Sequence, residues 1–150
     1  MSQRPSQRES AIGALFAVLG QLSLGTSGTT VKRNAALPER VTDHAMAILR
    51  DGEMGEPEVS LSPLTYHWQH QVAIELFVAD ADTAARDNRM DGLLTELAGL
   101  IEADRTLRGV IEYAEIGAPK FDELAPDGSS GIKACLLPVV LHYSSSGPLN

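Results

Sequence analysis

The sequence has little of the residues that build two common classes of site. It contains one cysteine in 150 residues, which excludes an internal disulfide framework and a cysteine-rich zinc site. Basic residues are also scarce, because 12 Lys and Arg stand against 20 Asp and Glu, a formal net charge of -8. Since nucleic-acid affinity comes largely from cations that neutralise phosphates, this balance argues against a surface that grips DNA or RNA. It does not exclude a protein that lets nucleic acid pass without holding it.

Long apolar runs are missing as well. The most apolar stretch near the start, residues 11–24, is interrupted by Gln21 and Ser23 and falls short of the about 20 apolar residues that cross a bilayer. Arg4 precedes this stretch, as in a signal peptide, but Glu9 and the lack of a clean cleavage site favour a cytosolic N-terminal helix. We therefore expect no contact with a membrane.

What the chain does have is the composition of one ordinary globular domain. Apolar residues make up 43% of it and charged residues 21%, which is too apolar for a disordered chain. A chain of this length can bury about two-thirds of its unfolded surface without a disulfide or a metal. No internal repeat is visible. We predict a single domain over residues 1–150, with residues 1–7 flexible.

Two amphipathic helices are predicted from apolar residues at helical spacing. The first covers residues 6–22, and the second covers residues 83–103, where Asp82 can cap the first turn. Arg86 is expected on the exposed side of the second helix. Gly92 lowers the helix propensity, which indicates close packing on a neighbouring element. The buried stripe of the second helix is expected to consist of Met90, Leu93, Leu94, Leu97 and Ile101.

The clearest strand covers residues 66–78. Polar and apolar residues alternate there over thirteen positions, which predicts one apolar and one polar face. A strand this long is expected to project beyond the domain as part of a hairpin or an extended arm. The apolar face is formed by Tyr66, Trp68, His70, Val72, Ile74, Leu76 and Val78.

Four shorter strands complete the prediction. They cover residues 31–35, 45–50, 110–116 and 132–143. Residues 42–50 also fit a helix, but we prefer a strand that ends in a turn at Asp51-Gly52.

The last of these strands is apolar at both sets of alternate positions. This predicts a central strand that is covered on both faces. Pro138 within it indicates a bulge or an edge position. The order of helix, three or four strands, helix and two strands is typical of an α+β domain, in which two main helices flank a mostly antiparallel sheet.

A search for catalytic or metal-binding residues finds little. His67 and His70 have the spacing of a metal pair, but residues three apart on a strand point to opposite faces. We expect an exposed His67 and a packed His70. Cys135 and His142 likewise fall on opposite faces of one strand, which argues against a Cys-His nucleophile. No phosphate-binding glycine loop is present, so we predict no catalytic residue and no cofactor.

Several segments resemble the tail terminator proteins of long-tailed bacteriophages and related gene transfer agents. The resemblance extends from about residue 10 to residue 149 and consists of turn and strand patterns rather than catalytic signatures. The segments that carry it are Val-Lys-Arg-Asn at 31–34, Leu-Pro at 37–38, Ile-Leu-Arg-Asp-Gly at 48–52, Leu-Ser-Pro at 61–63, Tyr-His at 66–67, Ala-Asp-Arg-Thr-Leu at 103–107, Pro-Val-Val at 138–140 and Pro-Leu at 148–149.

The resemblance implies a structural virion protein located in the phage tail and assembled in the bacterial cytoplasm. Such a subunit forms a hexameric homo-oligomeric ring on the end of the tail tube. The ring stops addition of the tail tube protein and joins the tail to the head-tail connector (stopper) protein, while DNA passes through its centre without specific binding. The resemblance implies no enzyme activity and no catalytic residue.

The contacts of such a subunit would lie on its surface. Two predicted loops, residues 51–58 and 121–130, are the best candidates for the partner interface. The first is an acidic loop, and the second begins with Phe-Asp and contains Pro-Asp-Gly. The residues that we expect at the interface are Asp51, Glu53, Glu56, Glu58, Phe121 and Asp122.

Two other readings of the sequence remain open. One is another head-tail connector subunit, such as a stopper or an adaptor. The other is a small cytosolic enzyme that uses Cys135 or the histidines. Loss of a measured turnover on Cys135→Ala would favour the enzyme, whereas closure of the purified protein into a ring would favour the terminator.

Overall fold

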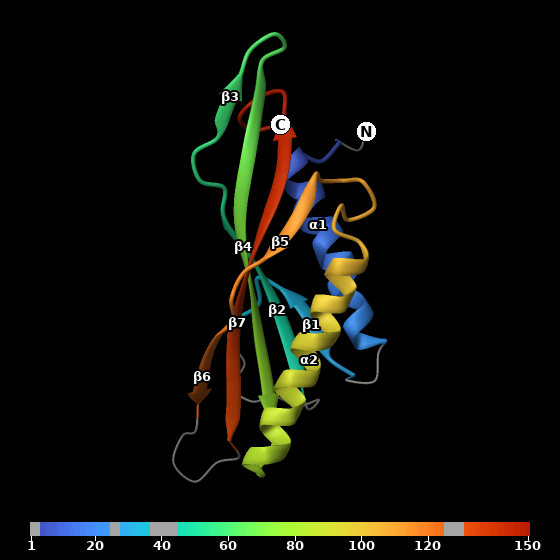
Figure 1. The fold of residues 1–150 in the computed structure, drawn as a ribbon, viewed down its shortest axis with the longest axis vertical. Coiled ribbons are helices and arrows are strands. Elements are labelled where there is room, and N and C mark those ends of the chain that lie inside the picture. Colours follow the sequence, from blue (N-terminus) through green and yellow to red (C-terminus); the bar gives the residue numbers. More distant parts are fainter. Residues whose placement is uncertain (1–3, 25–27, 37–44, 125–130) are drawn as a thin grey trace.

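A computed structural model describes residues 4–24, 28–36, 45–124 and 131–150. Two long strands, β4 (Thr65–Ala79) and β7 (Ile132–Ser145), pair antiparallel along almost their whole length and form the spine of a sheet (Figure 1). Within the described residues this sheet has seven strands. The predicted long strand at residues 66–78 is therefore confirmed.

The shorter strands extend this spine on both sides. β2 (Ala45–Glu53) pairs antiparallel with the second half of β4, and β1 (Thr30–Arg33) pairs parallel with β2. β3 (Glu58–Ser60) pairs with the first residues of β4. β5 (Tyr113–Ile116) and β6 (Lys120–Leu124) lie one after the other along the free edge of β7. The sheet is thus mostly antiparallel, as predicted, and the parallel pair of β1 and β2 makes it mixed.

Both helices lie on one face of the sheet (Figure 1). Ser6 caps α1 (Gln7–Leu19), which continues into the short 3-10 helix η1 (Gly20–Ser23). Asp82 caps α2 (Thr83–Ala103) by accepting a hydrogen bond from the backbone of the first turn. The predicted α+β domain with two main helices is confirmed. No helix in the described part of the chain is long and apolar enough to span a membrane.

The main core lies between the helices and the inner face of the sheet. Alternate side chains of β4, from Trp68 to Val78, are buried there together with the predicted stripe of α2. Leu94, a member of that predicted stripe, is only partly buried. The opposite, outer face carries the polar side chains of β4. A smaller apolar cluster on that face is centred on Ile48 and Phe77.

The predicted turn at Asp51-Gly52 is wrong. β2 continues to Glu53, and its register with β4 shifts between Arg50 and Glu53. Gly52 has φ +65° at this irregularity, and a Cβ there would lie 1.8 Å from the carbonyl oxygen of Gln71. The dipeptide therefore forms a β-bulge within a continuing strand. Its sequence misled the prediction because bulges and turns both use glycine at positive φ.

The predicted loop at residues 121–130 is also partly wrong, since its first part belongs to β6 (Lys120–Leu124). Residues 125–130 lie outside the described residues. The loop therefore supplies one more edge strand to β7, and three strands rather than two follow α2 in the part of the chain that the structure describes.

Two predictions for α2 fail. Arg86, expected on the exposed side, is buried because its guanidinium donates to the carbonyl of Asp80 and packs against Gly131. Gly92, expected at a close contact, is exposed, and an added Cβ would have no atom within 4 Å. The helix thus tolerates this glycine without a packing reason.

β7 is a central strand, as predicted, but its outer face is not fully covered, since Leu136 is 37% exposed. Pro138 fits within it because of the break between β5 and β6. The carbonyl of Pro138 accepts a hydrogen bond from the backbone N–H of Gly117, and Gly117 lies in the segment that connects β5 to β6. Since the carbonyl and nitrogen of a strand residue point to the same side, the missing N–H of Pro138 faces that break.

Candidate functional site

The acidic residues predicted to share one loop are distributed over three elements. Asp51 and Glu53 belong to β2, Glu56 lies in the link that follows, and Glu58 begins β3. The prediction of a continuous acidic loop from residue 51 to residue 58 is therefore wrong. Asp51 and Glu53 thus share one strand, whereas Glu56 and Glu58 lie beyond its end.

Asp51 takes part in an internal ion network. The guanidinium of Arg33 on β1 donates to the carboxylates of both Glu9 on α1 and Asp51. These hydrogen bonds lower the pKa of Glu9 and of Asp51, and they raise the pKa of Arg33. Arg33 thus joins the first helix to the sheet, and the carboxylate of Asp51 is already satisfied within the chain.

The backbone of Asp51 also holds the buried histidine of the core. The Nε2 of His70 lies 2.6 Å from the carbonyl oxygen of Asp51, and its Nδ1 lies 2.7 Å from the hydroxyl of Tyr143. A carbonyl can only accept, so Nε2 carries the proton and Nδ1 accepts from the tyrosine. Burial lowers the pKa of His70 and raises the pKa of Tyr143 to about 12. Both side chains are therefore neutral near pH 7.

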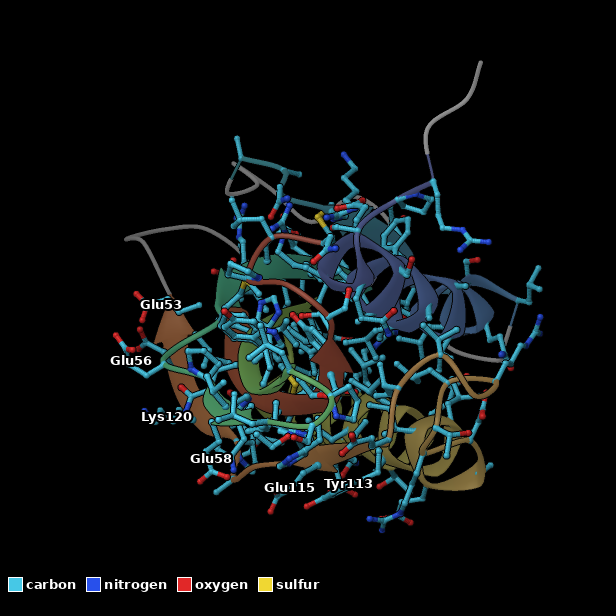
Figure 2. The ribbon with its side chains drawn as sticks, turned by 90° about the horizontal axis from the view of Figure 1, so that it is seen from above. Glu53, Glu56, Glu58, Tyr113, Glu115 and Lys120 are labelled. Carbon is cyan, nitrogen blue, oxygen red and sulfur yellow. The ribbon has the colours of Figure 1, made fainter. Side chains whose placement is uncertain are left out.

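The three remaining carboxylates of this segment are exposed. Glu53, Glu56 and Glu58 have no cationic side chain within 4.0 Å among the residues that the structure describes. Figure 2 shows them along the side of the molecule away from α1, with Glu115 on the same side. Such unpaired carboxylates are available to cationic groups of a partner.

An open groove of about 660 Å³ lies beside these carboxylates. Glu56, Glu58 and Glu112 contribute to its lining, together with His67 and His142. The exposed His67 accepts or donates a hydrogen bond with Ser60 of β3, as its predicted exposed position allows. The groove is therefore acidic and polar, and its walls come from β3, β4 and β7.

A stacked pair of rings lies beside the groove, and one member of the pair, His142, lines it. The rings of Tyr113 and His142 lie 4.2 Å apart and almost parallel, and His142 also contacts the carboxylate of Glu115. Tyr113 is 40% exposed. We did not predict this pair from the sequence, because it depends on the register in which β5 meets β7.

Phe121 and Asp122 lie on β6, away from the acidic segment in the sheet order. Phe121 is 53% exposed, and the ammonium of Lys133 lies 5.1 Å from its ring centre. Lys133 also pairs with Asp87 of α2. Asp122 is exposed. The two predicted loops thus give two separate surfaces rather than one.

A projecting hairpin carries three exposed apolar side chains. We call residues 54–66 the arm, which contains β3, the turn that follows and the start of β4. Figure 1 shows it extending beyond the ends of the neighbouring strands. Val59 is 51% exposed, Leu61 76% and Leu64 48%. The sequence predicted an extended arm at the long strand but not this apolar tip, although the Leu-Ser-Pro-Leu sequence carries its signal.

The residues considered for catalysis stay apart in the structure. Cys135 is buried on the inner face, where burial raises the pKa of its thiol, whereas His142 belongs to the groove on the outer face. His67 is exposed and His70 is buried, as predicted. No group of three potential metal ligands occurs among the described residues.

Comparison with known proteins gives no family. No protein-family model matches the chain, and no curated protein matches it.

Proposed function

We propose that this chain is the subunit of a ring that ends the tail tube of a bacteriophage or a gene transfer agent. The ring stops further tube subunits from adding, joins the tail to the head connector and lets DNA pass. The observation that carries the proposal is the arm, whose three exposed apolar side chains project from a domain with a closed core. Exposed apolar patches of this kind are typical of protein-protein contacts.

The position of the resembling segments supports this proposal. Residues 31–34 form the end of β1 and the residue after it, residues 48–52 lead into the bulge of β2, and residues 61–63 form the turn of the arm. These segments thus include the end of a strand, a bulge and a turn. A family of ring subunits without catalytic residues would be recognised by such features.

The charge of the chain supports a passage for DNA rather than a clamp. A ring of subunits that each carry -8 is strongly acidic, and acidic assemblies repel the phosphate backbone. The unpaired carboxylates Glu53, Glu56 and Glu58 lie together on one side of the subunit. We propose that this side flanks the hole of the ring, where some of its carboxylates also meet a neighbouring subunit.

Deletion of the gene tests the proposal. A producer that lacks the protein should make tails of uncontrolled length, or tails that do not join heads, and the wild-type gene supplied in trans should restore normal particles. Negative-stain images of the purified protein should show closed rings. Normal-length tails on infectious particles without the protein would rule out the terminator function.

A binding measurement tests the passage of DNA separately. The purified ring should retain little or no double-stranded DNA at about 0.15 M salt, where the Debye length is about 8 Å. Tight retention at this salt concentration would contradict the acidic conduit, even if the tail phenotype supported the terminator.

A further inference from the structure

The arm has a complementary surface elsewhere on the same chain. A small hollow of about 90 Å³ lies between α1 and the segment that follows α2. Its lining is mostly aliphatic, and it includes Ala14, Ala17, Val18, Leu107, Arg108 and Val110. A water molecule takes about 30 Å³ of liquid, so the hollow has the volume of about three water molecules. This volume is comparable with that of one aliphatic side chain.

The charges around the hollow are opposite to those of the arm. Arg105 and Arg108 are exposed, and within the described part of the chain no carboxylate lies within 4.0 Å of either guanidinium. On the arm, Glu56 and Glu58 lack a cation in the same way. The arm therefore combines an apolar tip with free carboxylates, and the hollow combines an apolar floor with free guanidinium groups.

The backbone beside the hollow is held in an unusual conformation. Leu107, Arg108 and Gly109 have φ of +50°, +60° and +81° in succession. Side chains of Asp104 and Thr106 hold this turn by accepting hydrogen bonds from its backbone N–H groups. Positive φ at two non-glycine residues costs free energy, and such strain persists mostly where a local shape has a function.

The arm cannot fill the hollow of its own chain. Figure 1 shows the arm extending from the end of the sheet, whereas the hollow is bounded by the middle of α1 and the segment before β5. A contact between the two surfaces therefore needs a second copy of the chain. Such a contact joins different surfaces of the two copies, and repetition of it gives a closed ring or an open filament.

We propose that the arm of one subunit docks in the hollow of the next, with Leu61 inserted between α1 and the turn at Arg108. Glu56 and Glu58 then pair with Arg105 and Arg108 of that next copy. This inference deepens the proposed ring by naming the surfaces that join its subunits. It rests on the proposed function only for the closure of the contact into a ring.

Disulfide formation between two variants tests the contact directly. Cys135→Ala removes the native thiol, and Leu61→Cys and Ala17→Cys are introduced into separate chains of this background. Ala17 is exposed and lines the hollow. Under mild oxidation, the mixture of the two variants should form a cross-linked pair, whereas neither variant alone should do so.

A matched control checks that exposure alone does not cause the cross-link. Leu149 is 77% exposed, against 76% for Leu61, but it lies outside the arm. Leu149→Cys mixed with Ala17→Cys should cross-link at least 10-fold more slowly. Equal rates for the two mixtures would overturn the proposed contact, and so would a cross-link formed by Leu61→Cys alone, which would show a tip-to-tip dimer.

A charge exchange tests the polar part of the contact. In the cross-linking mixture, Glu58→Arg on the Leu61→Cys chain and Arg108→Glu on the Ala17→Cys chain should each slow the reaction about 10-fold. Both changes together should restore the rate to within about 3-fold, because the pair is then reversed rather than lost. No rescue by the double change would overturn the pairing of these two residues.

The outcomes separate this contact from the proposed function. Rings that form without a cross-link between residues 61 and 17 would overturn the contact and leave the ring proposal standing. A cross-link in a protein that forms only open filaments, with normal tails in the deletion strain, would support the contact and refute the terminator. A wild-type protein that stays monomeric at all concentrations would refute both.

Discussion

Gly52 is the position at which a single methyl group should do the most damage to the sheet. An added Cβ would lie 1.8 Å from the carbonyl oxygen of Gln71 and 2.9 Å from the Cα of Val72. These atoms belong to the backbone of β4, which is paired with β7 on its other side and cannot move aside. Gly52→Ala must therefore distort the bulge itself.

The size of the effect follows from three contributions. The left-handed backbone costs an alanine roughly 1–2 kcal/mol. Distortion of the bulge also breaks the hydrogen bond between His70 and the carbonyl of Asp51, which leaves a buried group unsatisfied at a cost of about 1–3 kcal/mol. Relief of the overlap adds to both. We expect Gly52→Ala to lower the free energy of unfolding by about 3–5 kcal/mol, a large part of the usual 5–15 kcal/mol.

Two other glycines supply matched controls for this prediction. Gly55 has φ +71° but no atom within 4 Å of its added Cβ, so Gly55→Ala should cost only the roughly 1–2 kcal/mol of the backbone term. Gly92 lies in α2 with open space around it, so Gly92→Ala should stabilise the protein by up to about 1 kcal/mol. Urea unfolding at one fixed protein concentration measures all three. A Gly52→Ala variant no less stable than Gly55→Ala would refute the bulge geometry.

Three further predictions follow from buried and paired groups. Because burial lowers the pKa of His70, its imidazole stays neutral in the folded protein, whereas in the unfolded chain it takes up a proton near pH 6.5. The free energy of unfolding therefore falls as the pH is lowered from about 6.5 to the pKa of His70 in the folded state. The free energy of unfolding should rise with pH in this window with a slope no steeper than about 1.4 kcal/mol per pH unit, the limit for one proton, and His70→Gln should lack this dependence. The same pH dependence of urea unfolding in the two proteins would contradict the assignment. Native Cys135, buried and with a raised pKa, should react with thiol reagents far more slowly than urea-unfolded protein, and Cys135→Ala should cost roughly 1 kcal/mol; labelling at the same rate in both states would show that the thiol is exposed. Arg33→Met should lower the free energy of unfolding by about 1 kcal/mol in dilute buffer and by much less in 1 M salt, because the ion pairs of Arg33 with Glu9 and Asp51 are partly exposed and are screened by salt. A loss of stability that does not depend on salt would indicate that Arg33 acts through packing instead.

The sequence predicted the parts of the fold that depend on periodicity. The alternation over residues 66–78 identified the buried face of β4 and the opposite placement of His67 and His70, and helical spacing identified α1 and α2. Each of these signals is repeated over many residues. The strand at residues 45–50 was also predicted, and residues 42–44, which fit either a helix or a strand, lie outside the described residues.

The features that failed depend on a partner strand or on a single side chain. β3 has three residues and β6 five, which is too short for a periodic pattern, and each exists because a longer strand offers a free edge. Arg86 is buried only because Asp80 and Gly131 come close to it in space. The hydrogen bond from the side chain of Gln7 on α1 to the distant carbonyl of Val110 is similar, because it forms only where α1 meets the segment that follows α2.

The candidate site shows the same division between local and long-range information. Composition predicted an acidic surface, and Glu53, Glu56 and Glu58 are exposed as a partner interface requires. Composition did not reveal that Asp51 is paired with Arg33, because that ion pair forms only where β1 aligns parallel to β2. An acidic run in a sequence thus gives the sign of a surface, and the strand register decides which of its members remain available.

The bulge at Gly52 links the stability of the core to the position of the arm. Just before it, Asp51 contacts Arg33 through its side chain and His70 through its carbonyl. Just after it, β2 ends and the chain enters the arm. A change at the bulge should therefore disturb both folding and assembly, whereas a change at Leu61 in the exposed tip has no core contact to break. Variants of the tip are for this reason the appropriate probes of assembly, and a loss of association in a bulge variant says nothing by itself about the interface.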